Sequence, residues 1–191
     1  MNIAASTIVD RIGLALEMTG AIVDGVTEAQ LDQPSLCAGW DLCTELNHLV
    51  GGMRIFAAEL TATEPGGEHH DDWLGSDHHA AFAVAADLDR AAWQRPGALD
   101  TTIRLGFGPV PGQLGALIHL GEVLVHGVDI AVVTQQQHLI DQHACGQLLN
   151  TMRDMDFDAF RRPGLFDPQQ RAPADAPAHQ QLLAFTGRPI S

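Results

Sequence analysis

The sequence predicts an all-α protein, a helical bundle formed by residues 1–191 as a single domain. Apolar residues recur at steps of three and four along several segments, which is the spacing of one face of an α-helix. Glycine- and proline-containing turn signals at residues 64–67 and 96–97 separate these segments. With 46% hydrophobic and 18% charged residues, the chain has the composition of a globular protein.

The first two helices carry the clearest patterns. We expect the first over residues 3–26, followed by a short helical turn for which Thr27 and Gln30 have the spacing of a capping box. The second begins after Asp41, its expected N-cap, and ends before residue 64. Its apolar face consists of Leu42, Leu46, Leu49, Met53, Phe56 and Leu60.

The rest of the chain continues this pattern with extra short elements. A third helix is expected from Ser76 or Asp77 to about Gln94, and a fourth that begins after Pro111 and Gly112 and reaches about Val133. Between them, residues 101–108 predict either a short strand pair or an extended loop. A fifth helix is expected over residues 141–157. The extended C-terminal part, residues 162–191, contains an apolar segment at 182–185 able to dock on the bundle.

Charge and composition exclude several classes of function. A formal net charge of −14 disfavours binding to nucleic acid. No apolar run approaches the roughly 18 residues of a membrane span, and the N-terminus lacks the basic stretch of a signal peptide, so we expect a cytoplasmic protein. All ten basic residues are Arg, which excludes a Lys Schiff base. Three cysteines without a CxxC spacing are expected to be reduced thiols: Cys37, Cys43 and Cys145.

Polar side chains line one face of the fourth predicted helix. His119, Glu122, His126 and Asp129 follow each other at steps of three and four, within a strongly apolar segment. Burying such a stripe is costly unless a partner compensates, and a metal ion does so by turning carboxylate and imidazole into ligands. The alternative is an ordinary exposed Glu–His pair, worth about 0.2–0.5 kcal/mol.

A second candidate ligand lies on the second predicted helix. His48 is about 120° away from the centre of the apolar face and shares its side with Glu45. Gly51 and Gly52 follow in mid-helix, where glycine is unfavourable unless a helix or ligand approaches closely. A lone histidine at this position is more often a structural residue than a ligand.

Four runs of sequence resemble a known family: residues 37–42 (CAGWDL), 46–52 (LNHLVGG), 122–131 (EVLVHGVDIA) and 182–188 (LLAFTGR). In this order they resemble the DinB-like superfamily, most closely the N-terminal metal-binding domain of mycothiol-dependent maleylpyruvate isomerases. The resemblance implies an up-down-down-up four-helix bundle and a divalent metal ion held by His48, Glu122 and His126. It also implies mycothiol, a low-molecular-weight thiol, as cosubstrate.

The chain departs from this family in two respects. Val128 stands where the family usually has Trp, which changes a pocket wall or a packing contact. The isomerase also has a further C-terminal domain, for which we expect no room in this chain, so maleylpyruvate isomerisation itself is not the expected reaction.

The other polar candidates are expected to surround the ligands. His119 is interpreted as a fourth ligand, an outer partner of the ligands or a packing residue, and Asp129 and Glu45 as outer partners that orient them. Trp40 either lines a pocket or packs. We interpret four further histidines and their neighbouring aspartates as exposed surface residues: His69, His70, His78 and His79. The alternative is that they form an adventitious metal cluster.

Two histidines and one glutamate leave coordination positions open, as in catalytic sites. Zn is the first candidate metal, and Ni, Fe, Co or Mn also suit these ligands. The leading hypothesis is that the metal lowers the pKa of a thiol, mycothiol or another, for transfer to, or isomerisation of, a small electrophile. The alternatives are a metal-dependent hydrolase and a non-enzymatic metal- or ligand-binding protein. We expect a monomer or homodimer that contacts neither nucleic acid nor membrane.

Overall fold

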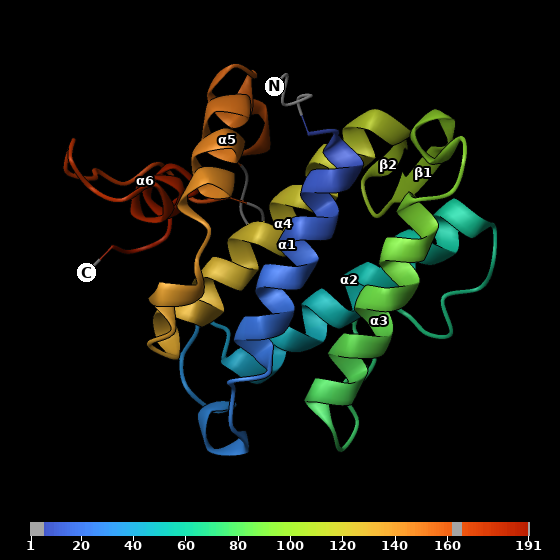
Figure 1. The fold of residues 1–191 in the computed structure, drawn as a ribbon, viewed down its shortest axis with the longest axis horizontal. Coiled ribbons are helices and arrows are strands. Elements are labelled where there is room, and N and C mark those ends of the chain that lie inside the picture. The colour runs from blue at the N-terminus through green and yellow to red at the C-terminus, as the bar shows by residue number, and fades with distance from the viewer. Residues whose placement is uncertain (1–5, 162–165, 191) are drawn as a thin grey trace, which may run out of the picture.

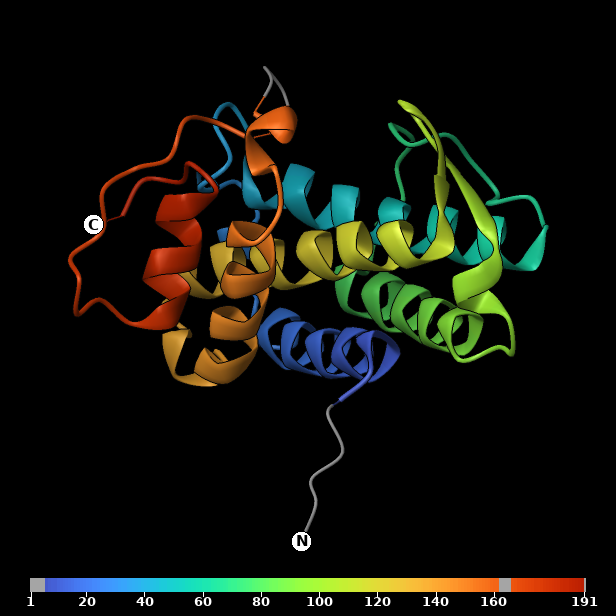
Figure 2. The ribbon, with the colours of Figure 1, turned by 90° about the horizontal axis from the view of Figure 1, so that it is seen from above.

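The computed structural model describes residues 6–161 and 166–190, and its main body is a bundle of four long helices (Figure 1). Helices α1 and α4 pack together along their length, as do α2 and α3. The chain runs one way in α1 and α4 and the other way in α2 and α3 (Figures 1 and 2). This arrangement confirms the predicted all-α, DinB-like fold. The four helices are α1 (Ile8–Val23), α2 (Leu42–Thr61), α3 (His78–Trp93) and α4 (Gly112–Val133).

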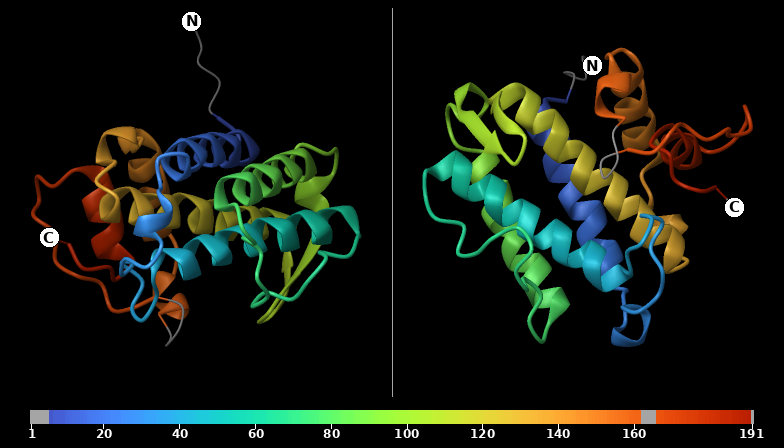
Figure 3. Two further views of the ribbon diagram at one scale, coloured as in Figure 1. Left: turned by 90° about the horizontal axis from the view of Figure 1, so that it is seen from below. Right: turned by 180° about the vertical axis from the view of Figure 1, so that it is seen from behind.

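Shorter elements lie at both ends of the bundle. Strands β1 (Thr102–Leu105) and β2 (Gly108–Pro111) form an antiparallel hairpin, which is the first of the two forms predicted for residues 101–108. Helices α5 (Gln142–Arg153) and α6 (Ala178–Phe185) pack together at the opposite end, beside α4 (Figure 3). Single 3-10 turns are η1 (Glu28–Gln30), η2 (Ala98–Asp100), η3 (Gln137–Leu139) and η4 (Phe157–Phe160).

Side-chain caps set where several helices begin. Asp41, Asp77 and Asp141 accept backbone N–H bonds at the starts of α2, α3 and α5, and Thr27 and Gln30 form the predicted capping box. Three boundaries differ from the prediction, the first being the end of α1 at Val23 instead of residue 26. Helix α1 begins at Ile8 because Thr7 caps it, and the predicted start at Ile3 lies outside the described residues. Helix α5 ends at Arg153, before two aspartates that favour helix ends over helix interiors.

Helix α4 runs through the centre of the protein. It is long and apolar enough to cross a membrane by length and composition, but 72% of its most apolar window is buried inside the protein, which is typical of a core helix. Close contacts need small residues: a Cβ on Gly127 would overlap Thr19 on α1, and one on Gly51 would overlap the Trp73 ring. The close neighbour of Gly51 is therefore Trp73, a residue of the segment between α2 and α3, and not the helix or ligand that was predicted. Around Gly52 nothing lies within 4 Å of such a Cβ.

Candidate metal centre

The three predicted ligands meet where α2 faces α4. His48 Nε2 lies 2.9 Å from Glu122 Oε2, and His126 Nε2 lies 3.5 Å from the same oxygen. One donor atom from each residue falls within 4.8 Å of the others. Glu122 and His126 share a face of α4 because they are four residues apart. His48 comes from the side of α2 that its angular position predicted.

A cavity opens beside these donor atoms. It has a volume of about 230 Å³, and its wall combines the three residues with α4 and the segment before α2. Trp40 belongs to this wall, with its ring centroid 5.0 Å from that of His48 and 6.0 Å from that of His126. The C-terminal part of the chain closes another side through Phe166, Asp167, Thr186, Gly187 and Arg188.

The second nitrogen of His126 faces a buried polar cluster. Its Nδ1 lies 2.8 Å from Glu45 Oε1 and 3.5 Å from Asp129 Oδ2, and both carboxylates are fully buried. Ser35 donates its hydroxyl to the other Glu45 oxygen at 2.6 Å. Because the Glu45 carboxylate accepts the proton of Nδ1, the neutral form of His126 carries its lone pair on Nε2, which faces Glu122.

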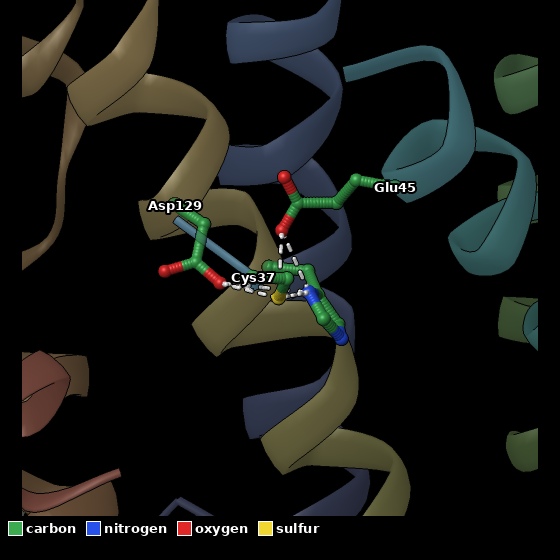
Figure 4. Close-up of side chains that lie close together, drawn as sticks. Cys37, Glu45 and Asp129 are labelled. Atoms are coloured by element: carbon green, nitrogen blue, oxygen red, sulfur yellow. Dashed lines mark hydrogen bonds and ion pairs between the residues drawn. The ribbon is translucent and has the colours of Figure 1, made fainter. Parts of the chain in front are cut away.

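Cys37 completes this cluster on the Nδ1 side of His126. Its sulfur lies 3.8 Å from His126 Nδ1 and between the carboxylates of Glu45 and Asp129 (Figure 4). Cys37 precedes α2, in a segment whose periodicity gives no direction, so the sequence pattern could not place it.

Arg188 supplies the positive charge of the cluster. Its Nε donates to both oxygens of Asp129, at 3.0 and 3.3 Å, and its Nη2 lies 3.0 Å from Oδ2. The same Nη2 donates to Cys37 Sγ at 3.5 Å. Arginine therefore balances one of the two buried carboxylates beside His126. Sequence reasoning did not single out this residue.

The electrostatics of the metal-free site favour opposite charges on neighbouring ligands. Burial alone would raise the pKa of Glu122, but hydrogen bonds with His126 and His48 outweigh it and hold that pKa well below 4.5. Burial likewise opposes the charged form of His126, but its acidic neighbours, Asp129 first, raise the pKa well above 6.5. In Glu45 burial prevails and raises the pKa. A bound cation would take the place of the proton on His126.

A profile of the family described as "Mycothiol maleylpyruvate isomerase N-terminal domain" matches residues 13–131, a range that includes His48, Glu122 and His126. The chain belongs to this family. Two curated relatives are the uncharacterized proteins MT0763 and Rv0738 of Mycobacterium tuberculosis, from strains CDC 1551 / Oshkosh and ATCC 25618 / H37Rv. Each is 31% identical over 178 residues, covering 92% of this chain and 94% of the relative. No solved structure matches the chain.

His119 lies on the polar face of α4 but apart from His48, Glu122 and His126. Its Nε2 is 2.6 Å from Asp89 Oδ2 on α3, and its ring packs against Phe56 and Trp93. Seven residues separate it from His126, which is about 10.5 Å along a helix axis. Among the roles predicted for His119, the structure favours packing over a role beside the metal. Val128, where the family usually has Trp, is buried in the core and does not line the cavity.

The four histidines interpreted as surface residues have different surroundings. His70 is exposed. His69 is partly buried with its ring centroid 5.0 Å from that of His48, and both line a second, open groove of about 460 Å³. Burial and the nearby His48 lower the pKa of His69. His78 and His79 approach the carbonyl of Val26 at 3.1 and 2.8 Å, and His78 is buried, so the surface interpretation is wrong for His78.

Proposed function

We propose that this protein binds a divalent metal ion through His48, Glu122 and His126 and activates a low-molecular-weight thiol, with mycothiol as the expected cosubstrate. The thiol would be transferred to a small electrophile or would catalyse its isomerisation. The observation that carries the proposal is the convergence of His48 Nε2, Glu122 Oε2 and His126 Nε2 beside a cavity. Membership of a family named after a mycothiol-dependent isomerase supports the choice of thiol.

The donor set fits a catalytic metal ion. Two imidazole nitrogens and one carboxylate suit Zn first, and also Ni, Fe, Co or Mn. Three protein ligands leave room for a small molecule, and these three border the cavity. When bound, the ion would supply the positive charge that lowers the pKa of a coordinating thiol.

The surrounding residues prepare the ligands and confine the substrate. Glu45 accepts the Nδ1 proton of His126 and so directs the lone pair of Nε2 toward Glu122. Trp40 forms a flat wall over both histidines. A volume of about 230 Å³ suits a small electrophile, with any larger part of the thiol remaining outside. Enclosure on several sides reduces competition from water.

The internal thiol of Cys37 is the main competitor for the role of nucleophile. Its sulfur lies 3.8 Å from His126 Nδ1, on the side of the ring opposite to the nitrogen that faces Glu122. Arg188 and two carboxylates already surround this sulfur. We therefore assign the reaction to an external thiol, and the test includes the variant Cys37→Ala.

The experiment is a conjugation assay with metal-loaded protein, a panel of small electrophiles and mycothiol, with other cellular thiols for comparison. We expect turnover that requires both metal and thiol, that is lost in His48→Ala and that persists in Cys37→Ala. The variant His138→Ala changes an exposed histidine and serves as the matched control. Metal-dependent hydrolysis that runs equally well without any thiol would contradict the proposal and favour the hydrolase. Metal binding without any turnover would favour a non-enzymatic carrier.

A further inference from the structure

Asp129 is a fully buried carboxylate that pairs with Arg188. Arg188 contacts it through Nε, at 3.0 and 3.3 Å, and through Nη2 at 3.0 Å, and this arginine is itself only 8% exposed. Such forked contacts fix both the charge and the orientation of a carboxylate. Asp129 Oδ2, the oxygen that Arg188 contacts twice, is also the one that lies 3.5 Å from His126 Nδ1.

Two carboxylates thus compete for a single N–H group. His126 Nδ1 lies 2.8 Å from Glu45 Oε1 but 3.5 Å from Asp129 Oδ2, so Glu45 is the acceptor and Asp129 is held back. Arg188 donates to the oxygens of Asp129, which would otherwise accept a hydrogen bond from this N–H group. Without the arginine, Asp129 would be an unpaired buried charge next to the imidazole, and the ring would be drawn away from Glu45.

We propose that Arg188 is a positioning residue of the metal centre, which holds Asp129 and thereby fixes the orientation of the ligand His126. This inference rests on the proposed function, because it concerns how well the three ligands bind a metal ion. It also extends the centre beyond residues 13–131, the range of the family profile, to the segment that follows α6. Docking of this C-terminal segment is then part of forming the site.

A second arginine provides a matched control. Arg161 also anchors the C-terminal segment, since it donates to the carbonyls of Asp167 and Phe185 and lies over the Phe157 and Phe185 rings. None of the contacts described for Arg161 involves Asp129. Arg161→Met therefore loosens the docking of the segment, whereas Arg188→Met also removes the partner of Asp129.

The test is a titration of the full-length metal-free protein with Co(II), followed by its visible absorption spectrum. We expect Arg188→Met to bind Co(II) about 10- to 100-fold more weakly, the usual effect of losing an outer partner of a ligand. At saturation its absorption bands should differ from those of the wild type, whereas Arg161→Met should keep wild-type bands and affinity. Arg188→Lys, which keeps the charge but not the fork, should bind with intermediate affinity.

The double variant Asp129→Asn/Arg188→Met separates the pairing of Asp129 from any other effect and also serves if Arg188→Met does not fold. It leaves no unpaired carboxylate beside His126, so we expect most of the Co(II) affinity to return. Wild-type affinity in Arg188→Met, an equal loss in Arg161→Met, or a double variant as weak as the single one would overturn the inference while leaving the proposed function intact. Failure of the wild type to bind Co(II) would instead contradict the proposed function.

Discussion

His126 Nδ1 lies 2.8 Å from Glu45 Oε1, a hydrogen bond that joins the middle of α4 to the first turn of α2. Both side chains are buried, and Ser35 holds the other oxygen of Glu45. The bond fixes the tautomer of the imidazole, so that Nε2 is available on the side where His48 and Glu122 meet.

Replacing Glu45 by Ala should weaken metal binding although this residue is not itself a ligand. Without the carboxylate, Nδ1 loses its acceptor and the ring loses its fixed orientation, so the dissociation constant should rise about 10- to 100-fold. Calorimetric titration with Zn(II) measures the change. Glu59→Ala is the control, because Glu59 is also on α2 but pairs with Arg104 on the hairpin. Unchanged affinity in Glu45→Ala would show that the hydrogen bond does not orient the ligand.

Metal binding should release a proton and should become stronger as pH rises. The acidic neighbours of His126 raise its pKa well above 6.5, so the protonated imidazole persists to higher pH and competes with the metal ion. The ion must displace this proton, so affinity increases as pH rises toward the raised pKa and levels off above it. Titrations in buffers of different ionisation enthalpy count the protons released. A pH-independent affinity between pH 6 and 8 would contradict this assignment.

Cys145 should be the least reactive of the three thiols. It is fully buried, and burial raises its pKa to about 12, which leaves almost no thiolate at neutral pH. Brief treatment of the native protein with N-ethylmaleimide, followed by peptide mass analysis, should label Cys37 and Cys43 first. Cys145 should react only after denaturation. Labelling of Cys145 at the rate of Cys43 would mean that this part of the core opens readily.

His119→Ala should destabilise the protein without affecting the metal centre. The substitution leaves Asp89, which is fully buried, without its 2.6 Å partner, and it removes a ring that packs against Phe56. We expect a loss of about 3 kcal/mol in the free energy of unfolding, measured by urea denaturation of the metal-free protein. Zn(II) affinity of the folded variant should equal that of the wild type. A loss of Zn(II) affinity with an unchanged free energy of unfolding would show that His119 contributes to the metal centre.

Helical periodicity predicted the fold and the pairing of Glu122 with His126, and the family resemblance added His48 as the third candidate ligand. Periodicity placed α2 and α4 and put Glu122 and His126 on one face, and the motif around His48 supplied the residue on the opposite helix. Periodicity also grouped His119 with these ligands. It describes the direction of a side chain around the helix axis and does not describe the distance between two residues along that axis.

The missed residues come from segments without periodicity or from far along the chain. Cys37 precedes α2, and Arg188 follows α6, so neither has a helical pattern that gives its direction. Their positions depend on tertiary packing: Arg188 lies 59 residues beyond its partner Asp129. A buried Asp on an apolar helix signals that some cation must pair with it, but the sequence does not say which.

Metal stoichiometry of the wild type and three single variants tests the central claim most directly. The proteins are treated with a mild chelator, reloaded with Zn(II), desalted and measured by elemental analysis. We predict one equivalent of metal in the wild type and in the control His138→Ala, and almost none in His48→Ala, Glu122→Ala and His126→Ala. Wild-type stoichiometry in all three of these variants would contradict the assignment of the metal centre.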